Sequence, residues 1–190
     1  MHQFEEHVRI DCQEVFRHGR QEDPRFLRIY EGMQASFGNR QFAQNVCLHE
    51  AAHAVLMEQD GLRNVRFYGP TVYYDEGTDS FSAAGAGVRA DDMPERQVDA
   101  AFVFEMTTQM AAGGVALREI GNVEGRVGDD HDYQEFLRMY LNDRITPPNL
   151  RRGTPEEFWE RAQQAASARL GDGNTRERVL AKQAEYLRQL

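Results

Sequence analysis

Two histidines four residues apart, within the most strongly helical segment of the chain, limit its fold more than any other feature. Residues 47–55 read Cys-Leu-His-Glu-Ala-Ala-His-Ala-Val, inside a helix predicted at about 40–59 from its buried-face spacing of apolar residues. In a helix, side chains at i and i+4 project from one face, one turn apart. His49 and His53 are therefore expected to bind one metal ion, and the fold must bring a third ligand to that face.

Zinc is the metal that best fits this pattern. Imidazole nitrogens bind Zn²⁺ at about 2.0–2.1 Å and, being neutral, leave the ion its positive charge. Glu50 follows the first ligand directly and is expected to act as general base on a zinc-activated water rather than to bind the metal. The pattern predicts a metallopeptidase. The alternatives are histidines on a solvated helix face and a degenerate, inactive site.

The third ligand is left open by spacing alone. Leu56 and Gln59 stand where the metzincin continuation requires glycine and histidine, which excludes that class. A gluzincin-type site would take a later glutamate, and the candidates are Glu76, Glu105 and Glu119. The acidic cluster at residues 128–132 opens a predicted helix and offers another source, although acidic residues there are also ordinary helix caps.

Three short blocks of the chain have the order of the motifs of one known protein family. Residues 49–54 read His-Glu-Ala-Ala-His-Ala, residues 113–119 read Gly-Gly-Val-Ala-Leu-Arg-Glu, and residues 128–132 read Gly-Asp-Asp-His-Asp. They resemble the HEAGHA, LGGRAAEE and G-A-x-N-D segments in the peptidase domain of the FtsH-type ATP-dependent zinc metalloproteases. The resemblance covers roughly residues 40–142.

The resemblance implies a ligand set and a fold. The final aspartate of the family's third block is its third zinc ligand, and it matches Asp132 here; Glu119 and His131 are the alternative ligands or ligand neighbours. The implied fold is mainly α (α+β), a helical zincin-like peptidase domain with a small β element beside the active site. Residues 63–90 agree with that element, because their β-formers alternate with turn residues as in two or three short strands.

The chain is expected to divide near residue 150. Residues 1–150 form the metallopeptidase-like domain, and Pro147-Pro148 begins a linker. Residues 151–190 form a pair of helices, at about 155–170 and 175–189, that is expected to pack on the same domain. The first of these helices opens with a capping box, from Thr154 to Glu157.

Composition narrows the expected surroundings and partners. A formal net charge of -9 and a pI of about 5.2 disfavour a broad nucleic-acid-binding role. The two cysteines form no disulfide framework, the first residues lack the apolar core of a signal peptide, and no apolar run is long enough to span a membrane. The protein is therefore expected to be cytoplasmic, with no membrane partner.

The sequence departs from the family in lacking a nucleotide-binding motif. There is no G-x-x-x-x-G-K-[ST] pattern and hence no AAA ATPase module. The expected enzyme is a stand-alone zinc metalloendopeptidase of the HExxH type that cleaves unfolded or flexible polypeptides, or depends on a separate ATPase or adaptor. A homo-oligomer is an open expectation, since family relatives are hexamers that assemble largely through the missing module. The alternative is a catalytically weak or inactive peptidase-fold protein that acts as a binding or regulatory module.

Overall fold

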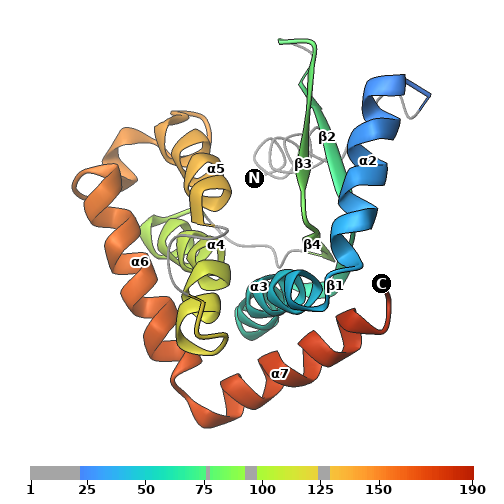
Figure 1. Cartoon of the computed structure of the whole chain (residues 1–190). Coiled ribbons are helices and arrows are strands. Elements are labelled where there is room, and N and C mark those ends of the chain that lie inside the picture. Colours follow the sequence, from blue (N-terminus) through green and yellow to red (C-terminus); the bar gives the residue numbers. More distant parts are fainter. Residues whose placement is uncertain (1–21, 76–77, 93–97, 124–128) are drawn as a thin grey trace.

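The computed structural model describes residues 22–75, 78–92, 98–123 and 129–190, and this part of the chain is mostly helical (Figure 1). Its helices are α2 (Pro24–Phe37), α3 (Arg40–Gln59), α4 (Ala100–Glu119), α5 (Asp129–Leu141), α6 (Pro155–Leu170) and α7 (Gly173–Leu187), with a 3-10 turn η1 (Pro148–Leu150). The mainly helical class predicted from the sequence is confirmed. None of these described helices is both long and apolar enough to cross a membrane.

The helices begin where short polar side chains satisfy free backbone N–H groups. The Asp23 carboxylate accepts a hydrogen bond from the Arg25 backbone N–H at 2.8 Å at the start of α2. The Asn39 side chain caps α3 in the same way. Thr154 and Glu157 form the predicted capping box of α6, in which each side chain accepts from the other residue's backbone N–H. The caps at Asn39 and Thr154 confirm the predicted starts of α3 and α6.

Helix α4 differs from its prediction at two glycines. The sequence pattern predicts a helix over about 94–120 with an interruption at Gly113-Gly114, and residues 94–97 of that range lie outside the described residues. At the start of α4, the Asp99 carboxylate accepts from the Phe102 backbone N–H at 2.8 Å. The helix then runs unbroken through both glycines, because the surrounding helices bury this stretch and outweigh glycine's low helix propensity.

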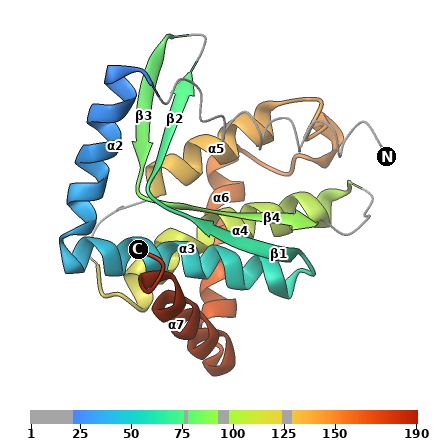
Figure 2. The ribbon, with the colours of Figure 1, turned by 90° about the vertical axis from the view of Figure 1, so that its right-hand side faces the viewer.

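The β element is a single antiparallel hairpin that bends in the middle. Its strands are β1 (Arg63–Tyr68), β2 (Thr71–Asp75), β3 (Ser80–Ala84) and β4 (Gly87–Asp92). Strand β2 pairs with β3 and β1 pairs with β4, which makes two small sheets in succession along the hairpin. The β1–β4 part packs on α3, while the β2–β3 part extends beside α2 (Figures 1 and 2).

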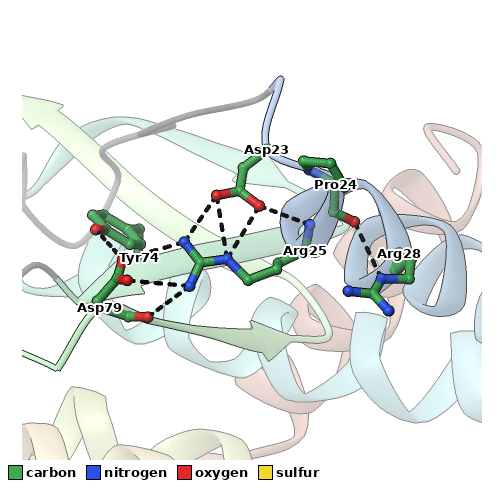
Figure 3. A network of polar contacts seen from close by, with 6 residues as sticks. All are labelled: Asp23, Pro24, Arg25, Arg28, Tyr74 and Asp79. Atoms are coloured by element: carbon green, nitrogen blue, oxygen red, sulfur yellow. Dashed lines mark hydrogen bonds and ion pairs between the residues drawn. The ribbon is translucent and has the colours of Figure 1, made fainter.

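An exposed polar network joins α2 to the β2–β3 part of the hairpin (Figure 3). Arg25 donates to the carboxylates of Asp23 and Asp79 at 2.9 and 3.2 Å, and its guanidinium lies over the Phe81 ring at 5.1 Å. The Tyr74 hydroxyl donates to Asp79 Oδ1 at 2.7 Å. Exposed ion pairs contribute only about 0–1 kcal/mol each, so this network orients the helix on the hairpin more than it stabilises the fold.

Helix α3 lies at the centre of the molecule. It packs against α4, α7, β1 and β4, and every position from residue 47 to residue 56 is buried. A helix surrounded in this way is normally apolar throughout. Here the buried stretch includes two imidazoles and a carboxylate, those of His49, His53 and Glu50. Burying polar groups costs folding free energy unless they have hydrogen-bond or ionic partners. The neighbours of these three side chains therefore decide how they are stabilised.

The two C-terminal helices pack on different parts of this core. Helix α6 packs on α4, and α7 packs on α3. Ala166 and Leu170 of α6 and Val179 of α7 belong to the same apolar cluster as the buried face of α3. Residues 151–190 therefore share their core with the rest of the described chain.

Candidate metal centre

His49 and His53 direct their Nε2 atoms to one point beside α3. The two Nε2 atoms are 2.9 Å apart, and the rings meet edge to face with centroids 4.5 Å apart. Both residues are at least 90% buried. The helical spacing thus places the two imidazoles as the sequence predicts.

Asp132 in the first turn of α5 completes a group of three candidate ligands. Its Oδ2 atom lies 3.2 Å from His49 Nε2 and 3.4 Å from His53 Nε2. Donor atoms that share a tetrahedral zinc, each about 2.0–2.1 Å from the ion, are roughly 3.3 Å apart. The three separations in this group, 2.9, 3.2 and 3.4 Å, are therefore close to those of ligands around one zinc ion.

The surroundings of Asp132 Oδ2 fit a bound cation. This buried oxygen faces the two imidazoles at 3.2 and 3.4 Å, but no hydrogen bond of normal geometry from a described residue satisfies it. A buried carboxylate oxygen without a partner costs free energy, and a metal ion between it and the two nitrogens would remove that cost. Two imidazoles and a carboxylate are also a donor set that zinc accepts.

The carbonyl of Gln109 fixes the ring of His53. His53 Nδ1 lies 2.6 Å from the Gln109 carbonyl oxygen of α4. A carbonyl only accepts, so Nδ1 must donate, and Nε2 keeps its lone pair toward the candidate site when the ring is neutral. Gln109 was missed by sequence reasoning, because any residue type supplies a backbone carbonyl and the pattern leaves no signal.

Gly113 of α4 forms the wall against which the His49 ring lies. A Cβ atom built at this position would come within 2.4–2.5 Å of three ring atoms. A glycine inside a helix costs about 1 kcal/mol relative to alanine, so it is tolerated where a neighbour needs the space. The glycine is visible in the sequence, but the prediction of an interrupted helix missed its contact with the His49 ring.

Glu50 lies beside the group of three without joining it. Its Oε1 atom is 4.0 Å from His49 Nε2, and the side chain is only 9% exposed. Burial raises the pKa of the Glu50 carboxyl above its usual range, although attraction to His49 and His53 opposes this. Glu50 is therefore a buried carboxylate of raised basicity beside a candidate metal site.

The other candidate ligands lie apart from this group. The donor atoms within 4.8 Å of one another belong to His49, His53 and Asp132, and neither Glu119 nor His131 joins them. Both of these side chains are exposed, on α4 and α5. The further candidate Glu105 is half-buried on α4 and is also absent from the group. Glu76 lies outside the described residues.

Comparison with protein-family models, with curated proteins and with solved structures gives no significant match for this chain. The resemblance to the FtsH-type proteases therefore stays a prediction from three short blocks. The function has to be inferred from the geometry of the site itself.

Zinc affinity should rise with pH in the neutral range. Burial alone would lower the pKa of His53, but Asp132 and Glu50 raise it to about 9, while the two imidazoles hold the pKa of Asp132 well below its usual range. Below pH 9 the metal-free site therefore holds a proton that zinc must displace. We expect the zinc Kd to fall about tenfold per pH unit between pH 6.5 and 8.5, with one proton released per ion. Calorimetry in two buffers of different ionisation enthalpy measures both, and a Kd constant over this range would contradict the expectation.

Proposed function

We propose that this chain is a zinc-dependent endopeptidase of the HExxH type, with a helical zincin-like fold, that hydrolyses unfolded or flexible polypeptides. One observation supports this proposal above all others. Donor atoms of His49, His53 and Asp132, from helices α3 and α5, converge within 3.4 Å of one another beside the buried Glu50.

Each residue has a distinct part in the proposed reaction. His49, His53 and Asp132 would hold the zinc ion. As a Lewis acid, the ion would lower the pKa of water and polarise the scissile carbonyl. Glu50 accepts the proton of the attacking water and delivers it to the leaving amine, which requires a carboxylate within hydrogen-bond reach of both. The hydrogen bond to Gln109 keeps the His53 ring in the required orientation.

The hairpin offers a means of holding an extended substrate. Strand β4 packs on α3, the helix that carries both histidines, and its only pairing among the described strands is with β1. Its second edge suits the addition of an extended peptide by backbone hydrogen bonds. That mode favours unfolded or flexible chains, or chains delivered unfolded by a separate ATPase or adaptor, because a folded substrate cannot offer a free strand.

Casein cleavage tests the proposal directly. The purified chain should degrade this unstructured protein, lose activity in a chelator such as 1,10-phenanthroline, and recover it when zinc is restored. The alternative, a binding or regulatory protein that keeps the site without catalysis, predicts bound zinc with no cleavage of casein or of peptide libraries. Cleavage that continues in the chelator would show that the activity does not come from the metal centre.

The third ligand can be identified by comparing Asp132→Ala with Glu119→Ala. Loss of a group that merely orients a ligand costs about 10–100-fold in metal affinity, so loss of Asp132 should cost more than about 100-fold. Glu119 is exposed and outside the ligand group, so its replacement should leave one zinc per chain. Metal content after dialysis and Kd by chelator competition measure the difference. The reverse result would favour the gluzincin-type alternative, and Asp132→Asn serves if the alanine variant folds poorly.

A further inference from the structure

Gln109 of α4 is bound to α3 at two points. Its backbone carbonyl accepts from His53 Nδ1 at 2.6 Å, and its side-chain amide donates to Asp60 Oδ2 at 2.7 Å. Gln109 is only 2% exposed; its bond to His53 is buried and its bond to Asp60 is partly buried. The same residue thus connects a candidate metal ligand to the C-terminal end of α3.

Arg169 of α6 forms an ion pair with Asp60. It donates to both Asp60 oxygens, at 3.1 and 3.0 Å, to the Leu56 carbonyl at 3.3 Å and to Gln59 Oε1 at 2.8 Å. The side chains of Asp60 and Arg169 are 12% and 25% exposed. This Arg169–Asp60 ion pair is bidentate and partly buried, so its geometry is more fixed than that of a solvated ion pair.

These contacts set the register between α3 and α4. Gly113 lies against His49, and one turn earlier Gln109 lies against His53, so the two helices run antiparallel at this contact. A slip of one residue would move α4 by about 1.5 Å along its axis. That displacement would break the His53–Gln109 hydrogen bond and press other α4 residues against the His49 ring.

We propose that Asp60, Arg169 and Gln109 form a positioning network for the metal centre. The network holds α4 in register, keeps the Gln109 carbonyl on His53 Nδ1, and so keeps His53 Nε2 directed at the metal. This inference rests on the proposed function, because it concerns the same site. The three residues touch neither metal nor substrate and act only through the position of His53.

Three variants separate positioning from general stability. Gln109→Met removes the side-chain amide but keeps a similar side-chain volume and the backbone carbonyl. Asp60→Asn removes the negative charge that pairs with Arg169. Glu58→Gln is the matched control: Glu58 lies on the same helix end but pairs with Arg178 and Lys182 of α7 instead. All are compared with the native chain well below their melting temperatures.

Two measurements are made on each protein. The first is the NMR signal of the His53 Nδ1 proton in metal-free protein, with its rate of exchange with water. The second is the zinc Kd by competition with a chromophoric chelator. We expect Gln109→Met and Asp60→Asn to accelerate proton exchange and to weaken zinc binding about tenfold. Glu58→Gln should change neither, even where it lowers Tm.

Several results would overturn the network. The first is a native exchange rate and a native zinc Kd in both Gln109→Met and Asp60→Asn. The second is a change of the same size in Glu58→Gln. The third is a native protein in which the His53 Nδ1 proton is not protected from exchange. A native chain that binds no zinc would instead overturn the proposed function. The exchange rates in metal-free protein would still decide whether the network positions His53, so the two failures are distinguishable.

Discussion

Replacing Glu50 by glutamine should slow peptide hydrolysis by about 10²–10⁴-fold while zinc stays bound. Glutamine has the same shape as glutamate but cannot accept the proton of the attacking water. Glu50 is 7% exposed and lies outside the group of three ligands, so the substitution removes basicity without removing a donor atom. It also removes a buried negative charge, so the fold should keep its stability. Hydrolysis of casein or of a quenched fluorescent peptide, with metal content determined on the same sample, checks both parts.

Glu58→Gln provides the control for this experiment. It makes the same chemical change two turns farther along α3, where the carboxylate pairs with α7 rather than facing the site. Its activity should match that of the native chain. If Glu50→Gln hydrolysed peptides at the native rate, another group would have to act as the base and the assigned mechanism would be wrong.

Gly113→Ala should weaken zinc binding by more than about 100-fold although it adds only one methyl group, because displacing a ligand costs more than the loss of a group that orients one. The new Cβ would lie 2.4–2.5 Å from three atoms of the His49 ring, which is far inside van der Waals contact. Overpacking of this kind costs about 1–3 kcal/mol, and alanine returns about 1 kcal/mol through its better helix propensity. The fold should therefore survive, and the ring of His49 should turn away from the position that a metal ligand needs. Zinc content and Kd, measured beside the circular dichroism spectrum, check this expectation.

Gly32→Ala is the matched control for this substitution. It also replaces a helical glycine, in α2, but an added Cβ at Gly32 meets no atom within 4 Å. It should keep native zinc affinity and gain up to about 1 kcal/mol in stability. Native zinc affinity in Gly113→Ala would show that close contact between α4 and His49 is not needed for the site.

The proposed centre depends on several elements at once. Helix α3 supplies two ligands and the base, α5 supplies Asp132, and α4 supports both imidazoles through Gln109 and Gly113. Helices α6 and α7 in turn pack on α4 and α3. Because α6 and α7 bury the outer faces of the helices that carry the site, truncation near residue 150 should disturb the metal centre as well as the core.

The sequence by itself determined the features that arise within a few residues. The helix at 40–59 followed from apolar spacing, and its geometry alone places His49 and His53 one turn apart on one face. The helix start at Thr154 followed from local hydrogen bonds between a side chain and nearby backbone N–H groups. These contacts join residues only a few positions apart, so a local sequence pattern suffices to predict them.

Only the tertiary structure decided which distant groups meet those histidines. Spacing left Glu76, Glu105, Glu119 and the acidic cluster at residues 128–132 open, and the choice of Asp132 depends on how α5 is placed relative to α3. The roles of the Gln109 carbonyl and of Gly113 also arise from packing, across more than fifty residues of chain. Such contacts follow from the burial of whole helix faces against one another, and no short stretch of sequence specifies which faces will meet.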